Sequence, residues 1–155
     1  MLCILTPEQI AKQKIRKFAK LVYTNFIDLA KNPDLKHNIT EIERVLYCKE
    51  CQLFVITEHG KMIGYLLGEI MDINDGRKVF YITYIFTAKN FRNKGIASQL
   101  MNLTEQVSRK LNLDGILLTC DTEDQQVFDF YAKRGFMPDV HLRKYDKYDV
   151  LYKIV

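Results

Sequence analysis

The feature that most constrains the fold of this chain is a strand–helix–strand succession in its second half. Lys78–Thr87 (KVFYITYIFT) is rich in β-branched and aromatic residues, and Gly115–Cys120 (GILLTC) is a nearly continuous apolar run typical of a central strand. Between them, Gly95–Leu111 repeats apolar residues at helical spacing, with one expected face formed by Ile96, Leu100, Leu103, Val107 and Leu111. Such a crossover predicts an α/β fold, in which helices flank a mixed, twisted central β-sheet.

The elements around this succession follow from periodicity and turn residues. A first amphipathic helix is expected to begin at a capping box at Thr6, to bury Ala11, Ile15, Phe18, Val22, Phe26 and Leu29, and to end at Asn32-Pro33-Asp34. A second, from the Asn38 capping pattern, buries Ile42, Val45 and Leu46. Leu53–Thr57 and Met62–Met71 then form a hairpin, and the turn Asn74–Arg77 leads into Lys78–Thr87. Asp124–Arg134 is a helix that stops at Gly135, and Val150–Val155 is the last strand.

Length and charge restrict the class of protein. The 155 residues fit one domain, 1–155, and 48% apolar with 27% charged residues is an ordinary globular balance. The formal net charge of +4 suits an anionic ligand, but the Lys and Arg residues are scattered, which argues against a nucleic-acid partner. No apolar run has the ~20 residues of a membrane span. We expect a cytoplasmic protein, with a nuclear location left open.

The cysteines indicate reduced thiols rather than a metal site. Cys48 and Cys51 have the spacing of a metal or redox pair, but no second pair is spaced to complete a zinc site. The pair also follows a helix-like segment instead of beginning one, which argues against redox chemistry. No metal is therefore expected.

The segment Arg92-Asn93-Lys94-Gly95-Ile96-Ala97 joins the strand Lys78–Thr87 to the following helix. The start of a helix leaves backbone N–H groups unpaired and carries partial positive charge, so it can hold a pyrophosphate. Gly95 and Ala97 lack bulk and allow phosphates to approach the backbone closely. Neither a G-x-G-x-x-G nor a P-loop motif is present.

Two segments together resemble a known family. Arg92–Ala97 resembles the pyrophosphate motif R/Q-x-x-G-x-G/A of the GNAT superfamily of N-acetyltransferases, and Asp124–Phe136 resembles its N-x-x-A-x-x-F-Y-x-K-x-G-F signature. Phe130, Tyr131, Lys133, Gly135 and Phe136 match that signature, whereas Asp124 and Val127 replace its Asn and Ala. The resemblance implies an acetyl-CoA-dependent enzyme.

The resemblance also implies roles for individual residues. The strand end Ile85-Phe86-Thr87 would splay from its neighbour and pair with the pantetheine arm, and the Ile85 N–H would polarise the thioester carbonyl. Tyr131 would protonate the leaving thiolate. The remaining cofactor-binding residues that we expect are Arg92, Asn93, Lys94, Gly95, Ile96, Ala97, Ser98, Asp124, Phe128 and Lys133.

The general base and the acceptor are less constrained. Tyr81 occupies the position where many family members carry a Glu, resembling some protein N-terminal acetyltransferases in which a Tyr works through water, and Glu69 is the carboxylate alternative. Because an α-amine has a pKa of roughly 7.7–8.0 and lysine one of about 10.4, a site without an obvious carboxylate favours an α-amine. Leu118-Thr119 and Tyr148-Asp149-Val150-Leu151 resemble acetyltransferases of histone N-termini.

The expected reaction is direct attack of a primary amine, on a protein or peptide N-terminus. The alternatives are a polyamine or aminoglycoside acetyltransferase, and a catalytically silent CoA-binding protein. The oligomeric state stays open.

Overall fold

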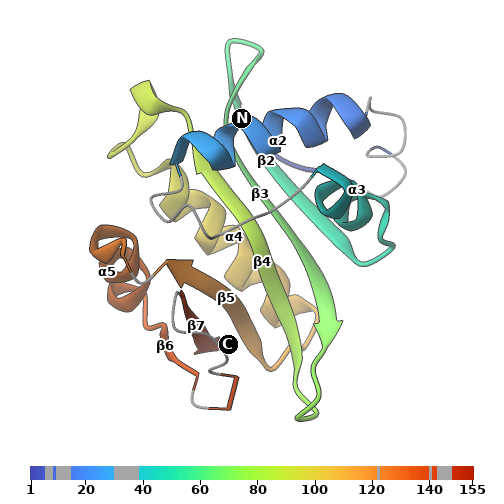
Figure 1. Ribbon diagram of the computed structural model, residues 1–155, viewed down its shortest axis with the longest axis vertical. Helices are drawn as coiled ribbons and strands as arrows, with labels where there is room; N and C mark the ends of the chain where they lie inside the picture. Colours follow the sequence, from blue (N-terminus) through green and yellow to red (C-terminus); the bar gives the residue numbers. More distant parts are fainter. Residues whose placement is uncertain (6–8, 10–14, 30–38, 122, 140, 143–147) are drawn as a thin grey trace.

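The structure is a computed structural model that describes residues 1–155 except 6–8, 10–14, 30–38, 122, 140 and 143–147 (Figure 1). The expected helix start at Thr6, the burial of Ala11, the helix end at Asn32–Asp34 and the cap at Asn38 lie outside the described residues, and for Phe26 and Leu29 only the backbone is described. Within the described ranges, none of the helices has the length and apolar character needed to span a bilayer.

The described strands form one sheet in the order β1-β2-β3-β4-β5-β7-β6. Their bounds are β1 (Leu2–Leu5), β2 (Cys51–Glu58), β3 (Lys61–Asp72), β4 (Lys78–Thr87), β5 (Gly115–Asp121), β6 (Met137–Pro138) and β7 (Tyr148–Ile154). β4 and β5 are parallel, whereas the other neighbours are antiparallel. The mixed α/β sheet expected from the crossover is therefore confirmed.

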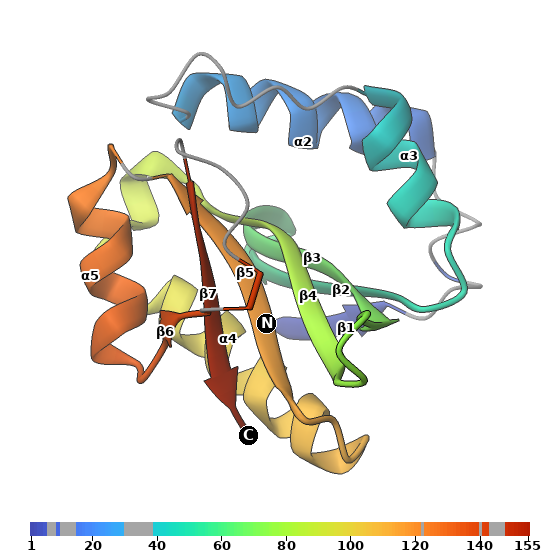
Figure 2. The ribbon, with the colours of Figure 1, turned by 60° about the horizontal axis from the view of Figure 1, so that its bottom comes forward.

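Helices cover both faces of the sheet (Figure 2). α2 (Ile15–Leu29) and α3 (Ile39–Tyr47) lie on one face, where Ile15, Ala19, Val22, Ile42, Val45 and Leu46 pack against side chains of β2, β3 and β4. α4 (Ile96–Lys110) and α5 (Gln125–Lys133) lie on the other face, over a core that contains Phe54, Leu66, Phe80, Ile82, Ile116 and Leu118. A single 3-10 turn, η1 (Lys89–Phe91), leads from β4 toward α4.

The apolar face of α4 is as expected at Ile96, Leu100, Leu103 and Val107, which are buried or pack against the core, but not at Leu111. Its buried residues are Ile96, Leu100, Met101, Thr104 and Ser108, whereas Leu111 is 48% exposed and follows the helix as its C-cap. The two hydroxyl residues can be buried because Thr104 Oγ1 donates to the Leu100 carbonyl at 2.9 Å and Ser108 Oγ donates to the Thr104 carbonyl at 2.7 Å. The expectation for Leu111 was wrong because periodicity alone extends the helix beyond its last turn.

Several boundaries also differ. β1 precedes the first element expected from the sequence, and β2 begins at Cys51 instead of Leu53. β7 begins at Tyr148, two residues before the expected start, and pairs with the short β6. The end of α5 is as expected: Gly135 has a φ of 91°, and the N–H groups of Gly135 and Phe136 donate to the carbonyls of Ala132 and Tyr131. The four cysteines are free thiols.

Candidate active site

A bulge in β4 opens the sheet. Leu67 pairs with Tyr84 and Gly68 pairs with Ile82, so Thr83 is an extra residue without a partner on β3. The parallel ladder between β4 and β5 ends at the pair Ile82–Leu118, one residue before the bulge. Beyond this point the two strands part, and a pocket of about 790 Å³ lies between their ends.

The start of α4 forms one end of this pocket. Gly95 is the N-cap, with a φ of 80°, and the first turn carries neither a side-chain cap nor an acidic residue. No described group accepts a hydrogen bond from the N–H groups of Ile96, Ala97 and Ser98, and a Cβ placed on Gly95 would meet nothing within 4 Å. Open space in front of unpaired donors fits the pyrophosphate of acetyl-CoA.

Arg92 is anchored beside this helix start. Its Nε donates to the Thr87 carbonyl at 3.1 Å, which fixes the loop between β4 and α4. Lys94 is exposed, and its ammonium lies 5.5 Å from the centroid of the Phe91 ring. The loop therefore presents its backbone toward the pocket and the Lys94 side chain toward its own aromatic neighbour.

Most of the expected cofactor-binding residues line the pocket. They are Ile85, Phe86, Thr87, Arg92, Asn93, Gly95, Ile96, Ala97, Ser98, Asp124 and Tyr131. Lys94, Phe128 and Lys133 do not line it: Phe128 packs against the core under α5, and Lys133 is exposed on that helix. Their roles stay predictions.

Tyr131 lies deep in the wall formed by α5. It is 5% exposed, and its ring packs edge-on against Phe130 and Phe136, at centroid distances of 5.2 and 5.5 Å. Burial raises the pKa of its hydroxyl, and the nearby Cys120 acts in the same direction. Tyr131 therefore keeps its proton at neutral pH, as a proton donor must.

Asp124, which replaces the Asn of the family signature, has a structural role that either residue can perform. Its Oδ1 accepts the N–H of Val127 at 3.2 Å and so caps the start of α5. The carboxylate also lies in the pocket lining. Its expected contact with the CoA arm stays a prediction, and the cap positions the helix that carries Tyr131.

The two candidate bases face each other on neighbouring strands but lie outside the pocket lining. Glu69 on β3 and Tyr81 on β4 are cross-strand partners. Glu69 is 7% exposed, and Arg44 Nη2 of α3 donates to its Oε1 at 3.2 Å. Burial raises the pKa of Tyr81, while a hydrogen bond with Thr119, a residue of the pocket lining, opposes that rise. Tyr81 is thus connected to the pocket through Thr119.

A second wall of the pocket consists of residues that the sequence did not indicate as site residues. Asn25 of α2 meets Tyr65, Tyr84 and Phe86 there. Tyr65 and Tyr84 are 1% and 6% exposed, and the rings of Tyr65 and Phe86 stack at 5.4 Å. The alternation of aromatic residues along β3 and β4 signals a packed face, but nothing in the sequence indicates which face borders a pocket.

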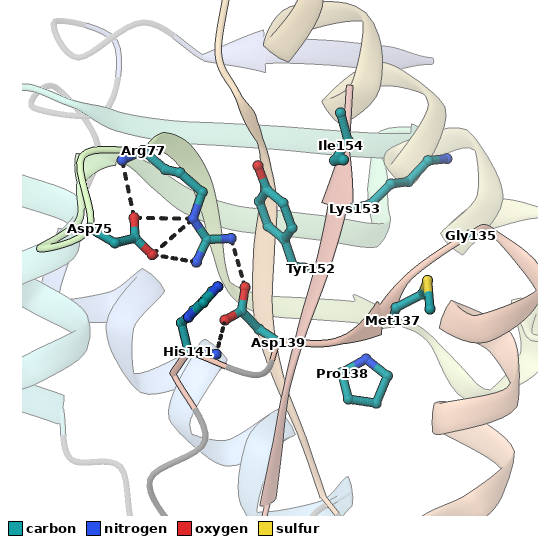
Figure 3. Close-up of a pocket in the computed structure, with 10 residues that line it drawn as sticks. All are labelled: Asp75, Arg77, Gly135, Met137, Pro138, Asp139, His141, Tyr152, Lys153 and Ile154. Carbon is teal, nitrogen blue, oxygen red and sulfur yellow. Dashed lines mark hydrogen bonds and ion pairs between the residues drawn. The ribbon is translucent and has the colours of Figure 1, made fainter.

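Another pocket, of about 800 Å³, lies between the β3–β4 turn and strands β6 and β7 (Figure 3). Arg77 Nη1 donates to Asp139 Oδ2 at 2.6 Å, Asp75 binds the rest of the guanidinium, and the Tyr152 ring lies 4.3 Å away. Asp139 also accepts two backbone N–H groups from the segment that follows it. Arg77 thus binds both carboxylates, and no expected site residue lies in this pocket.

A splayed pair of strands beside an unpaired helix start is the arrangement that the resemblance to the N-acetyltransferases implied. A family model described as the acetyltransferase (GNAT) family matches residues 17–136. The chain belongs to the GNAT acetyltransferase family, and it is an acetyl-CoA-dependent N-acetyltransferase.

Solved structures of this fold include enzymes with different acceptors. The chain resembles a structure of the NatC complex bound to Gag peptide and CoA (TM-score 0.73, 17% identity, covering 100% of this chain and 98% of that one). It also resembles Ard1 from Thermoplasma volcanium (TM-score 0.69, 17% identity, covering 100% of this chain and 97% of that one). An aminoglycoside acetyltransferase from an uncultured soil metagenomic sample is similar as well (TM-score 0.68, 21% identity, covering 94% of this chain and 95% of that one). A search of curated proteins gave no match. Identities this low support the fold alone.

Proposed function

We propose that this enzyme acetylates the α-amine of a protein or peptide N-terminus. The observation that carries the proposal is the uncharged wall formed by Asn25, Tyr65, Tyr84 and Phe86 on the side of the pocket next to α2. A polyamine or an aminoglycoside carries several positive charges, which are recognised by carboxylates. The described lining on this side offers amide and aromatic groups instead, which suit a peptide backbone with one amine.

The ion pair of Glu69 supports the same class of acceptor. Because Arg44 binds Glu69, the buried carboxylate nearest Tyr81 is already engaged. An α-amine, about a tenth neutral at pH 7, needs less help from a base than a lysine, less than a thousandth of which is neutral. We assign Tyr81, which keeps its own proton because burial raises its pKa, to orient, with Thr119, the water that carries the amine proton away, with Glu69 as the alternative base.

The remaining roles follow from the pocket. When bound, acetyl-CoA supplies an activated acetyl thioester. The N–H groups of Gly95 to Ser98 bind its pyrophosphate, and the Ile85 N–H, on the strand end freed by the bulge, donates to the carbonyl oxygen. Tyr131 holds a proton on Oη for the leaving sulfur, since burial keeps this hydroxyl neutral.

Direct transfer to the amine is favoured over an acetylated enzyme. Cys120 is the thiol in the pocket lining, and it is 2% exposed. Burial raises its pKa to about 12, with Asp124, Asp149 and Asp121 acting in the same direction. A protonated thiol is a poor nucleophile, so Cys120 is unsuited to carry the acetyl group. Free thiols throughout the chain are consistent with a cytoplasmic location.

A second candidate is a small-molecule amine acetyltransferase. Asp121 and Asp124 in the pocket lining would favour a cationic acceptor. The capping role of Asp124 and its position at the start of α5, away from the α2 wall, make this candidate weaker.

Thiol release from acetyl-CoA tests the two candidates directly. The acceptors are short peptides with a free N-terminus, the same peptides with a blocked N-terminus but a free lysine, a polyamine and an aminoglycoside. Turnover with free N-termini and not with blocked ones is expected. Turnover restricted to the polyamine, the aminoglycoside or the lysine side chain would overturn the proposal.

A further inference from the structure

Two buried polar atoms in the pocket lining have no hydrogen-bond partner in the described part of the chain. They are Nδ2 of Asn25, on α2, and Oγ1 of Thr83, the bulge residue of β4. Leaving a buried polar group unpaired is unfavourable, and such groups are rare in folded proteins. Two of them in one pocket indicate that a bound molecule supplies their partners.

Asn25 comes from the face of the sheet opposite the pyrophosphate site. α2 and α3 cover one face and α4 the other (Figure 2), so Asn25 reaches the pocket from the side of the uncharged wall. A side-chain hydrogen bond from Asn25 opposes the burial that raises the pKa of Tyr65 to about 12. That contact falls short of full hydrogen-bond geometry, and an amide nitrogen carries two hydrogens, so Nδ2 keeps donor capacity for a bound molecule.

The chemistry of Nδ2 restricts its partner. An amide nitrogen can only donate, so its partner must be an oxygen that accepts. A peptide N-terminus carries a carbonyl oxygen next to its α-carbon, two bonds from the carbon that bears the amine. A polyamine carries no oxygen at all.

We propose that Asn25 is a specificity-determining residue, whose Nδ2 donates a hydrogen bond to the first carbonyl oxygen of the peptide acceptor. This inference rests on the proposed function and explains how the site would select a peptide amine. Thr83 Oγ1, which can donate or accept, is the second unpaired group available to the same acceptor backbone.

The same donor chemistry would also suit an amide carbonyl of the pantetheine arm. The peptide is favoured because Asn25 belongs to the helix layer away from α4, whereas the pantetheine arm must run from the start of α4 along the freed end of β4. The test therefore has to distinguish a carbonyl oxygen of the peptide from one of the pantetheine arm.

The experiment compares a peptide with an isostere in which a C–F group replaces the first C=O, because fluorine is a much weaker acceptor. Wild-type enzyme is expected to lose about 10-fold or more in kcat/KM on the isostere. Asn25→Leu, which keeps the size and removes the donor, should lose about as much on the peptide and treat the two acceptors alike. Its KM for acetyl-CoA should stay unchanged. Asn25→Ala repeats the measurement in case the leucine disturbs α2, and Thr24→Ala, at an exposed neighbour, is the matched control.

Each other outcome counts against the inference. A variant that prefers the peptide as strongly as the wild type would show that Asn25 does not contact the carbonyl. A raised KM for acetyl-CoA, with the peptide preference intact, would place the carbonyl on the pantetheine arm. Wild-type enzyme that leaves free N-termini unmodified would overturn the proposed function and this inference together, whereas the first two outcomes overturn the inference alone.

Discussion

The substitution Gly95→Ala tests two roles of Gly95, one in the backbone conformation at the start of α4 and one in the binding of acetyl-CoA. Gly95 caps α4 with a φ of 80°, in the left-handed region that side chains other than glycine rarely adopt. A methyl group there meets no protein atom within 4 Å, because it would project into open space at the pocket end where we place the pyrophosphate. The substitution should therefore have two independent effects, one on stability and one on the KM for acetyl-CoA.

The magnitudes follow from the geometry. Forcing alanine into the left-handed region costs about 1–2 kcal/mol, which for a domain of this size lowers the Tm by about 2–8 °C. Displacing the pyrophosphate from one backbone N–H removes a hydrogen bond to a charged group, worth about 1.5–3 kcal/mol. At 1.36 kcal/mol per factor of ten, the KM for acetyl-CoA should rise about 10- to 100-fold.

Two other glycines provide matched controls. Gly60 and Gly76 have φ values of 74° and 92°, and a Cβ on either also meets nothing within 4 Å, but both lie outside the pocket lining. Gly60→Ala and Gly76→Ala should reproduce the loss of stability in urea unfolding without changing the KM, which is measured by thiol release. If Gly95→Ala raises the KM no more than these controls do, the assignment of the pyrophosphate to the start of α4 is refuted.

Three further substitutions or conditions test the remaining roles. Tyr131→Phe should lower kcat by about 10²- to 10⁴-fold with little change in the KM for acetyl-CoA, and wild-type turnover across pH would rule out Tyr131 as the acid. Arg77→Ala leaves the Asp139 carboxylate, whose side chain is 4% exposed, without its cation and should lower the free energy of unfolding by about 3–5 kcal/mol in urea; a loss below about 1 kcal/mol would mean that the pair is solvated. Burial raises the pKa values of Cys51 and Cys120 from the ordinary 9.0 to about 12, so their contribution to stability is complete below about pH 9 and is lost as the pH rises toward 12. Under reducing conditions, each thiol should lower the free energy of unfolding by about 1.4 kcal/mol per pH unit in that window. If the free energy of unfolding of Cys120→Ala falls with pH as steeply as that of the wild type, this reasoning is contradicted.

The parts of the fold that depend on local pattern could be predicted from the sequence. The crossover from β4 through α4 to β5, the glycine at the start of α4 and the glycine after α5 each depend on residue type or spacing at one place. β1 could not be predicted, because four residues carry little periodicity and their partner, β2, lies far along the chain. Leu111 was misplaced because helical periodicity does not indicate where the last turn ends.

The candidate site divides in the same way. The pyrophosphate loop and Tyr131 were expected from motifs, and the structure brings them to one pocket. The pairing of Arg44 with Glu69 joins residues 25 positions apart, and the approach of Asn25 depends on how α2 packs. Both are tertiary contacts, for which a single sequence carries no local signal.

The bulge at Thr83 has a consequence for how β4 distributes its side chains. Before it, Phe80 and Ile82 point into the core under α4 while Tyr81 faces Glu69; after it, Tyr84 joins Leu67 on the face covered by α2 and α3. Tyr81 and Tyr84 are an odd number of residues apart, yet they share one side of the sheet, which regular alternation forbids. Deleting Thr83 would restore strict alternation, with Ile82 still in the core under α4 and Tyr84 and Phe86 still on the face covered by α2 and α3, and would remove the bulge beside which β4 and β5 part. The opening between β4 and β5 thus depends on the length of one strand, counted in single residues, more than on which residue occupies the added position.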